Sequence, residues 1–569
     1  MKSREAIEMT EKIPTPYTIL SFLFLIITFF WLQSIYSPFA FIQEGVYLLQ
    51  PYDVKGALKG GIFFGAYLFA ILAILVAILA KNSLLAVIFI VFISVTYGID
   101  MFVQLVGSNK NGLSFEIFSL GMLEISRAMD VLLFKTPLVQ ASAIAVLLFL
   151  VLFLARKYMF KPIRVKTSYS VASFFMAVVL VLGVTLKIFS IVGQSFPAPI
   201  KTLSIAVEFF LENNNQEKRI LSSSVNPIVK PEYKTIVWVI DESVGGQYLS
   251  VNGYEQDTTP YLKSLGSSHD FINYGVVPSI SNCSATSNLF LRIGLTTKPS
   301  FSQNIQTFRD SMRKLPTIFQ YAKRAGYQTY LIDAQAAEGQ LQDRLSLDDT
   351  TYIDQFVTFS RRFIPNVRDQ QALKVINNVL ENEQEKLNFV VVVKWGAHWP
   401  YNLTYPVDKE YFKPATRESY TEMKEENKKL ILNAYQNSIR YTVDSFLKQL
   451  TYKGIDSDQI VFYTSDHGQS LFYNNDPLTH CHSEDDLPKD EFKVPLMVFS
   501  KNVRDKLWIN SASRVSQEQI FPTTLKMMGY SDKLYLSYGD PLDENNNIAT
   551  RKSYILDTGK LVDFEETVN

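Results

Sequence analysis

Residues able to bind metals or move protons follow three apolar, β-branched runs in the second half of the chain. Residues 235–240 precede Asp241 and Glu242, residues 389–393 precede His398, and residues 460–464 precede Asp466 and His467. Such runs are typical of buried parallel strands, and ligands of α/β sheets bind beyond the carboxyl ends of those strands. Carboxylate and imidazole groups are ligands of divalent transition metals. The sequence therefore predicts a metal and acid–base site at one sheet edge.

The histidines strengthen this prediction. The chain has five, and four of them lie at or after expected strand ends: His398, His467, His480 and His482. Asp466 and His467 are adjacent, so a carboxylate and an imidazole can face one cation from the same turn. The fifth, His269, lies beside two serines in a polar turn and is expected to be a satisfied polar residue or a surface residue, without a role in the site.

A nucleophile is expected in the small polar segment 282–288, which precedes the apolar residues 289–291. A helix that begins here would offer backbone N–H groups and its positive end to an anion. A metal beside a hydroxyl lowers its pKa and lets it attack phosphorus. Serine and threonine are also ordinary helix N-caps, and the segment alone does not exclude that simpler role.

Composition excludes several classes of protein. The 569 residues include 55 Lys+Arg and 55 Asp+Glu, and this zero net charge argues against a nucleic-acid binder. The two cysteines, Cys283 and Cys481, exclude a disulfide-rich scaffold and a four-thiolate metal site. Free thiols are the default expectation, and a single bridge that would pin the two segments together is the alternative.

The first part of the chain is expected to cross a membrane. Five apolar runs have the length of a membrane-spanning helix: 17–35, 62–80, 84–103, 138–155 and 168–186. The first lacks a small-residue cleavage site and is expected to be retained. Lys and Arg concentrate at the N-terminus and between the fourth and fifth runs, which predicts that both are cytoplasmic. Five crossings then place the rest of the chain outside the cytoplasm.

Three regions follow from these patterns. Residues 1–192 are expected to form a membrane domain, 193–233 a bridging helix and linker, and 234–569 one α/β catalytic domain. In the last region, a helix at 316–325 should end at Gly326 and lead into a strand at 329–332. The external connection 104–136 contains a helical pattern, expected to be a surface helix or a wall of a lipid-entry site.

On these residues the chain resembles the alkaline phosphatase and sulfatase superfamily, and within it the membrane-bound phosphoethanolamine transferases of Gram-negative bacteria. Four features carry the resemblance: Asp241-Glu242-Ser243, the Asn-Gly-Tyr-Glu-Gln-Asp-Thr-Thr-Pro stretch at 252–260, Ser-Asp-His-Gly-Gln-Ser at 465–470, and His480 fourteen residues before Val494. The fold implied is an N-terminal five-helix transmembrane domain and a C-terminal periplasmic α/β sulfatase-like domain, anchored in the bacterial inner membrane.

The resemblance also implies a site. Zn²⁺, rather than Mn²⁺ or Mg²⁺, would be held by Glu242, Asp466, His467 and the oxygen of the nucleophile. His398 and His480 would contact the phosphate or act as general acids. The number of metal ions stays open.

The nucleophile segment departs from the family pattern. Sulfatase-type spacing favours Ser284, because Ser287 stands three and Gly294 ten positions later. Thr286 is the second candidate, and Cys283 or Ser287 remain behind it. A formylglycine is not expected, because the Cys-x-Pro-x-Arg pattern is missing.

The external connection 104–136 also departs from the family pattern. Arg127 stands where the family has glutamate. This difference weakens any transfer of the family's donor-lipid contacts to the external connection.

The function implied is transfer of phosphoethanolamine from phosphatidylethanolamine to lipid A or another envelope glycan through a covalent phospho-serine or phospho-threonine, by a monomer. The alternatives are a phosphoglycerol transferase that uses phosphatidylglycerol, a sulfatase-like phosphohydrolase, and a catalytically silent lipid-binding membrane protein. The acceptor has no readable signature in the sequence.

Overall fold

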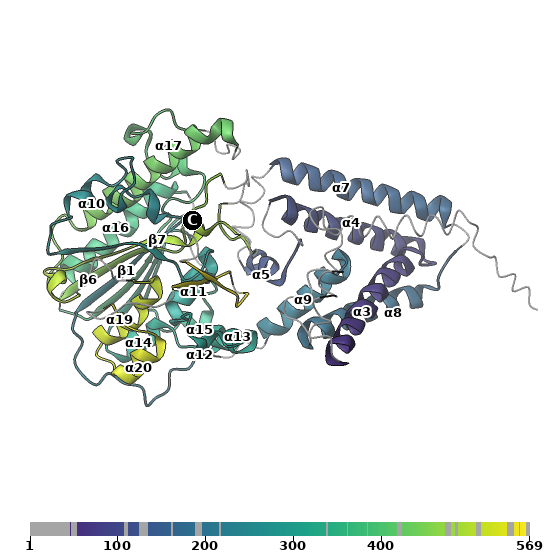
Figure 1. The fold of residues 1–569 in the computed structure, drawn as a ribbon, viewed down its shortest axis with the longest axis horizontal. Coiled ribbons are helices and arrows are strands. Elements are labelled where there is room, and N and C mark those ends of the chain that lie inside the picture. Colours follow the sequence, from purple (N-terminus) through teal and green to yellow (C-terminus); the bar gives the residue numbers. More distant parts are fainter. Residues whose placement is uncertain are drawn as a thin grey trace, which may run out of the picture. The chain divides into compact units, whose positions relative to one another are not determined.

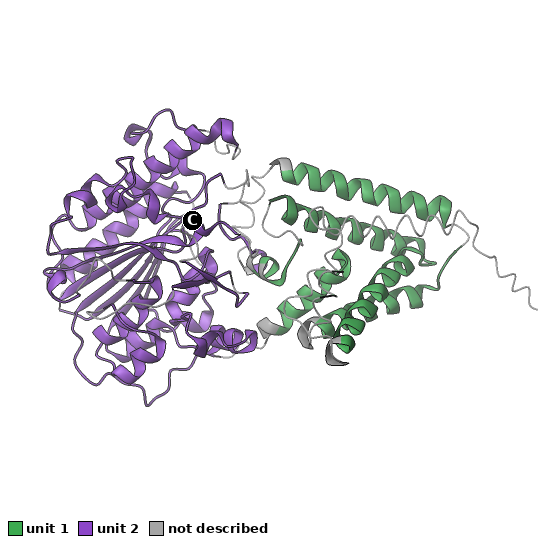
Figure 2. Ribbon diagram, viewed as in Figure 1, with its two compact units in different colours: residues 1–119, 134–214 green, residues 120–133, 215–569 purple. Residues whose placement is uncertain are grey.

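The computed structural model divides the chain into two compact units, of residues 1–119 with 134–214 and of residues 120–133 with 215–569 (Figure 2). It describes residues 42, 46 and 54–564, apart from 107–111, 124–134, 161–162, 188–195, 215–217, 337–339, 361, 384, 418–423, 473–478, 484–486, 508–513, 543–550 and 557.

The first unit is helical. Its described helices of five residues or more are α3 (Val54–Ile78), α4 (Ser83–Val106), α7 (Lys135–Leu154), the π-helical turn Ala155–Met159, α8 (Thr167–Lys187) and α9 (Ala198–Asn214), and α5 (Phe115–Leu123) begins in this unit and ends in the other. Among the described residues, four stretches are long and apolar enough to cross a membrane: Ala57–Ile78, Ser83–Val106, Pro137–Met159 and Thr167–Val184. They match four of the five expected spans. The expected span at 17–35 lies outside the described residues, as does Arg127, so five crossings stay a prediction.

The expected amphipathic segment of the bridging region is α9. It packs in the first unit against α4 and α8. Lys201 of α9 and Asp100 of α4 form an ion pair of 2.7 Å in which both side chains are 1% exposed. The backbone N–H of Leu113 also donates to Asp100. Charged groups this deeply buried need such partners, so the pair ties α9 to an apolar helix.

The second unit is built on a seven-stranded sheet with the order β2-β7-β6-β1-β5-β3-β4 (Figure 1). The strands are β1 (Thr235–Asp241), β2 (Phe271–Pro278), β3 (Gln328–Asp333), β4 (Gln355–Thr358), β5 (Asn388–Val393), β6 (Gln459–Ser465) and β7 (Lys493–Phe499). Five run parallel, from β6 to β4, whereas β7 is antiparallel to both of its neighbours. A separate hairpin pairs β8 (Lys552–Tyr554) with β9 (Leu561–Asp563).

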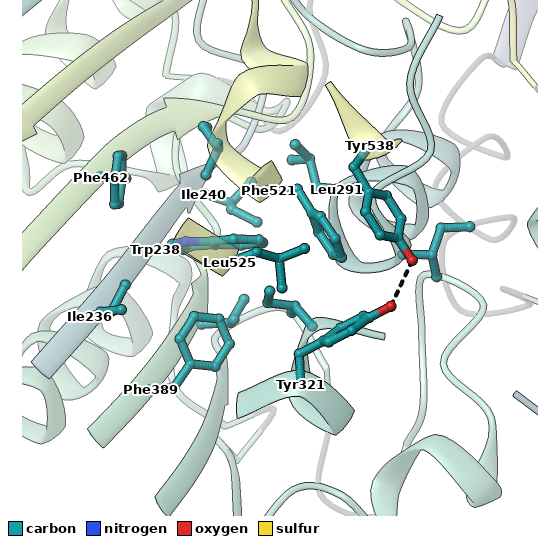
Figure 3. Close-up of a cluster of buried hydrophobic side chains, with 14 of the residues drawn as sticks. Ile236, Trp238, Ile240, Leu291, Tyr321, Phe389, Phe462, Phe521, Leu525 and Tyr538 are labelled. Carbon is teal, nitrogen blue, oxygen red and sulfur yellow. Dashed lines mark hydrogen bonds between the residues drawn. The ribbon is translucent and has the colours of Figure 1, made fainter. Parts of the chain in front are cut away.

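Both faces of the sheet are buried. Along β1, Ile236, Trp238 and Ile240 enter one apolar cluster (Figure 3), and Val237 and Val239 enter another on the opposite face. Helices that contribute to the first cluster are α11 (Ser284–Ile293), α13 (Ile305–Lys314), α14 (Ile318–Arg324), α19 (Ile520–Met527) and α20 (Asp532–Tyr538). Those that contribute to the second are α10 (Pro260–Ser264), α16 (Pro365–Asn382), α17 (Lys428–Ile439) and α18 (Phe446–Leu450). The short helices α12 (Pro299–Ser302) and α15 (Leu347–Thr350) complete the unit.

The α/β fold predicted from the sequence is confirmed. The three apolar runs are β1, β5 and β6, which are adjacent and parallel, with β1 in the middle. The expected helix is α14, which starts in a capping box at Thr317 and is followed by Gly326 at φ +89° before β3. The chain after β1, β5 and β6 therefore emerges at one edge of the sheet.

Candidate metal centre

Glu242, Asp466 and His467 form the candidate metal centre. Asp241 and Ser465 are register partners at the ends of β1 and β6, so the residues that follow come out side by side. All three side chains are buried, and one ligand atom from each lies within 4.8 Å of the others. Parallel pairing of two neighbouring strands thus joins residues 224 positions apart in the sequence.

The two oxygens of the Asp466 carboxylate differ in their hydrogen bonding. Its Oδ1 accepts hydrogen bonds from the backbone N–H groups of Ser243 (3.1 Å) and His467 (2.7 Å). Its Oδ2 is buried and has no hydrogen-bond partner among the described residues. Burying such an oxygen without a partner is costly. A cation bound here would satisfy it, so the residues fit a metal.

The His467 ring is oriented for the same centre. Its Nδ1–H donates to the carbonyl of Gly468 at 2.7 Å. Its Nε2 lies 3.3 Å from Glu242 Oε1 and 3.6 Å from Asp466 Oδ2. A carbonyl partner on one ring nitrogen fixes the tautomer and leaves the other nitrogen to bind a metal.

The charges in the centre do not balance on their own. Burial and the nearby Glu242 raise the pKa of Asp466 to about 7. Burial opposes the charge of His467, but Asp466 and Glu242 outweigh it and raise the pKa of that imidazole to about 9. Two buried carboxylates therefore share one imidazole. Metal binding replaces protons on such ligands, and a divalent cation would neutralise the excess.

Ser284 is the hydroxyl that the fold brings to this centre. It is the first residue of α11, and its Oγ lies 3.1 Å from Glu242 Oε2 and 3.1 Å from His467 Nε2. The hydroxyl of Thr286 instead bonds to Ser281 Oγ (2.8 Å) and donates to the Cys283 carbonyl (3.0 Å). Ser287 donates to the Asp466 carbonyl. Of the four nucleophile candidates, Ser284 alone has its side-chain oxygen against Glu242 and His467.

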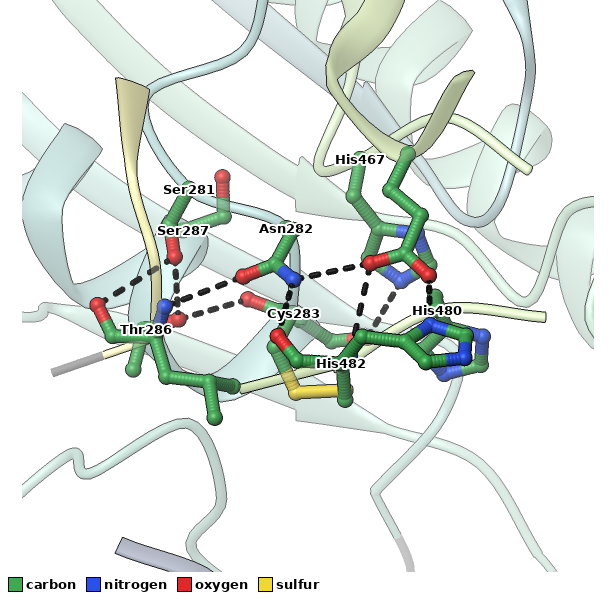
Figure 4. Close-up of a disulfide and its surroundings, with 12 residues drawn as sticks. Ser281, Asn282, Cys283, Thr286, Ser287, His467, His480 and His482 are labelled. Atoms are coloured by element: carbon green, nitrogen blue, oxygen red, sulfur yellow. Dashed lines mark hydrogen bonds and ion pairs between the residues drawn. A yellow bond between two sulfur atoms is a disulfide. The ribbon is translucent and has the colours of Figure 1, made fainter. Parts of the chain in front are cut away.

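Cys283 and Cys481 are joined by a disulfide (Figure 4). The expectation of free thiols is therefore wrong, and the alternative, a bridge between the two segments, is what the structure contains. Spacing could not predict it, because the cysteines are 198 residues apart and only the packing of α11 beside the 479–483 segment brings their Cα atoms to 4.7 Å. The bridge also removes Cys283 as a free nucleophile.

The other candidate histidines surround the centre. The ring of His480 stacks on that of His467, with centroids 4.2 Å apart (Figure 4). Burial, together with the neighbouring His467, lowers the pKa of His480 well below its usual value, and His398 and His482 act in the same direction. His398 lies against Trp395, at 5.3 Å between ring centroids. His269 is 71% exposed and takes no part in the centre, as expected.

Three side chains near the centre were not predicted from the sequence. Gln335 follows β3, and its Nε2 donates to Glu242 Oε2 at 2.9 Å. Lys394 follows β5 and forms a fully buried 2.5 Å ion pair with Asp241, and Tyr463 donates to the same carboxylate oxygen. The available signal was their position in the sequence: Lys394 directly follows an apolar run, Tyr463 lies within one, and Gln335 comes two residues after the end of β3. Asp241 is thereby paired with Lys394 and Tyr463, whereas Glu242, Asp466 and His467 make up the candidate metal centre.

Comparisons with known proteins show the family to which the chain belongs. The Sulfatase family model matches residues 234–530, more than half of the chain. A Kdo(2)-lipid A phosphoethanolamine 7''-transferase from Escherichia coli K12 is 25% identical over 344 residues, which are 57% of this chain and 57% of that protein. Phosphoethanolamine transferase EptC from Escherichia coli O18:K1:H7 is 25% identical over 47% of this chain and 45% of its own length. The chain thus spans about half the length of these curated relatives.

A solved structure extends the similarity in fold to nearly the whole chain. The integral membrane protein lipooligosaccharide phosphoethanolamine transferase A from Neisseria meningitidis has 16% sequence identity and a TM-score of 0.56 over 91% of this chain and 96% of that one. The resemblance to phosphoethanolamine transferases that the motifs indicated is confirmed by these relatives. With the family model matched across β1 to β7 and over the candidate metal centre, the chain belongs to the Sulfatase family.

Proposed function

We propose that this protein transfers phosphoethanolamine from phosphatidylethanolamine to an envelope glycan, such as lipid A or the lipopolysaccharide core. The observation that carries the proposal is the position of Ser284, whose Oγ lies 3.1 Å from both Glu242 and His467 at the first turn of α11. A hydroxyl among metal-capable ligands at a helix N-terminus suits attack on a phosphate. The named activities of the relatives support the choice of head group.

The metal of this proposal is zinc. Glu242, Asp466 and His467, with the Ser284 oxygen, would hold it, and a mixed oxygen and imidazole set suits zinc better than the oxygen-only sets that magnesium prefers. When bound, the ion supplies Lewis-acid chemistry that lowers the pKa of a hydroxyl and offsets charge on the phosphate.

The protein's own residues then carry two displacements. Ser284 Oγ passes its proton to His480 or His398 and attacks phosphorus, and the bond from phosphorus to the diacylglycerol oxygen breaks. Diacylglycerol takes up a proton as it leaves, and phosphoethanolamine remains esterified to Ser284. The acceptor oxygen displaces Ser284 in turn and loses its proton. His480, stacked on His467, and His398, in electrostatic reach of His480, are the proposed phosphate contacts and proton carriers.

The proposed location is the bacterial inner membrane, with residues 1–192 embedded, 193–233 as a bridge and 234–569 in the periplasm, as a monomer. In the part of the chain that the structure describes, four helices long and apolar enough to cross a membrane support an embedded domain. The anchor also makes physical sense, because donor and leaving group are both lipids that need not enter water.

Mass spectrometry of lipid A and core from cells with and without the protein tests this proposal. Phosphoethanolamine on either glycan, present only with the protein, is the expected result. In parallel, the purified full-length protein receives vesicles of phosphatidylethanolamine or phosphatidylglycerol with the acceptor. Transfer from phosphatidylglycerol alone, or release of the free head group with no acceptor product, would contradict it.

A further inference from the structure

The disulfide joins the two segments that flank the candidate metal centre. Cys283 immediately precedes Ser284, and Cys481 immediately follows His480. Figure 4 draws the bridge at Cys283 together with His467, His480 and His482. The covalent link therefore runs between the backbone of the proposed nucleophile and that of the histidine stacked on His467.

Asn282 connects the same two segments through hydrogen bonds. Its carbonyl accepts from the N–H of Cys481 at 3.0 Å. Its side-chain amide donates to the His482 carbonyl and to Glu491, at 2.8 Å each, and its Oδ1 accepts from the N–H of Leu556. Glu491 in turn pairs with the His482 ring. The backbone at 481–482 is thus held from several sides to the residue before Cys283.

His480 itself has little to hold it. Within the described part of the chain its ring makes one hydrogen bond, between Nδ1 and Thr479 Oγ1 at 3.1 Å. The Thr479 carbonyl accepts from the N–H of Ser470, which restrains the backbone on one side. On the other side the backbone is restrained by the Cys283–Cys481 disulfide and by the hydrogen bonds of Asn282. The position of the His480 ring over His467 therefore depends on its backbone.

The candidate metal ligands do not depend on the bridge in this way. Glu242 and Asp466 follow β1 and β6, which are hydrogen-bonded along their whole length in the centre of the sheet. His467 is further fixed by its bond to Gly468. Opening the bridge should leave these three side chains in place and loosen the segment that carries His480, which then keeps only the hydrogen bonds of Asn282 and Glu491 on that side.

We propose that the Cys283–Cys481 disulfide is a positioning element for transfer, which holds His480 in register with Ser284 at the candidate metal centre. This inference rests on the proposed function. Opening the bridge lowers turnover while the metal stays bound. Effects of small misplacements on rate are large, and a loss of roughly 10- to 100-fold in kcat is expected, with KM for the lipid donor maintained.

The test uses full-length protein in detergent, with phosphatidylethanolamine as donor and a water-soluble trialkylphosphine as reductant. The phosphine breaks the S–S bond, takes oxygen from water to become its oxide, and leaves two thiols. Turnover, zinc content and circular dichroism are measured before reduction, after it, and after reoxidation. The expected result is a fall in kcat that reoxidation reverses, with zinc content and secondary structure unchanged.

Two variants separate positioning from general stabilisation. In Cys283→Ala/Cys481→Ala, kcat should equal that of the reduced native protein, and the phosphine should not change it. In His480→Ala, whose bridge is intact, reduction should lower the residual kcat by far less than in the native protein, because the group that the bridge positions is gone. If the double variant fails to fold, reduction of the native protein and of His480→Ala by the phosphine still decides whether the disulfide positions His480.

The positioning role would be overturned if reduction lowered kcat by the same factor in His480→Ala as in the native protein. Loss of zinc in parallel with the loss of activity on reduction would also overturn it. So would unchanged turnover in the reduced native protein, and in that case transfer itself would stand. Absence of transfer by the oxidised native protein would instead contradict the proposed function, so the two failures are distinguishable.

Discussion

Two groups of buried acids lie next to each other at the end of β1, and they are balanced differently. Asp241 belongs to what we call the ion-pair cluster, with Lys394 at 2.5 Å and Tyr463 at 2.8 Å. Glu242, the next residue, belongs to the candidate metal centre, where a second carboxylate and one imidazole face it. One acid has a permanent cation from the chain, and the other does not.

This difference indicates what each cluster is for. A buried carboxylate with a lysine and a tyrosine is a closed structural unit, because its charge and its hydrogen bonds are satisfied from within the protein. The candidate metal centre keeps a buried Asp466 oxygen without a partner among the described residues and a hydroxyl at hydrogen-bond distance. Such a set is completed by an external cation and by substrate.

The largest effect should come from the hydroxyl of the metal centre. We expect Ser284→Ala to lower transfer by at least about 10³-fold, because the covalent step is lost. Thr286→Ala is the matched control, and it should stay within roughly threefold of native since its hydroxyl bonds to Ser281 and Cys283. Rates with labelled phosphatidylethanolamine measure both, and the opposite ranking would assign the nucleophile to Thr286.

Breaking the ion-pair cluster should damage the fold instead. Lys394→Met removes the cation that faces Asp241 and leaves a buried charge, at an expected cost of about 3–5 kcal/mol in the free energy of unfolding. Chemical unfolding of the full chain in detergent measures this cost. A variant of native stability that had lost only activity would show that the two clusters are not separate.

Asp369 is a buried carboxylate beside the ion-pair cluster, and it accepts hydrogen bonds from the backbone N–H groups of Trp395 and Gly396, just after Lys394. It should give the stability of the chain a pH dependence. Burial raises its pKa to about 6, against the opposing effect of Lys394. The folded chain thus keeps a proton that the unfolded chain releases near pH 4, so stability should fall as the pH rises from about 4 to 6, by at most about 3 kcal/mol. Asp369→Asn should remove this part of the slope in thermal unfolding, and an identical slope in the variant would contradict the assignment.

A smaller effect is expected from Gln335, which orients Glu242 through the 2.9 Å bond to its Oε2. Gln335→Ala should weaken zinc binding by roughly 10-fold, as loss of a partner of a metal ligand commonly does, without unfolding the chain. Competition with a chelator measures the affinity. Unchanged affinity would limit Gln335 to a packing role.

Much of the second unit was predictable from the sequence, because its signals are local. The runs at β1, β5 and β6 are short, apolar and β-branched, and the carboxylates and histidines that follow them must meet at one edge once the strands are parallel. Ser284 was favoured from its spacing to Ser287 and Gly294, and its Oγ lies at the centre.

Long-range pairings were not predictable. Nothing around Lys394 indicated that its ammonium group would lie buried against Asp241, since the partner is 153 residues away. The disulfide depended on where α11 packs beside the 479–483 segment, which a single sequence does not encode locally. The Gln335 bond to Glu242 likewise arises only from strand order.

The central claim is that the candidate metal centre needs a divalent cation that the ion-pair cluster does not. Zinc content of the purified full-length protein, compared with Glu242→Gln, tests it most directly. We predict about one zinc or more per native chain, and a loss of most of it in the variant, whose carboxamide is a poor ligand, with the fold retained. A native protein free of bound metal that still transfers phosphoethanolamine would contradict the account.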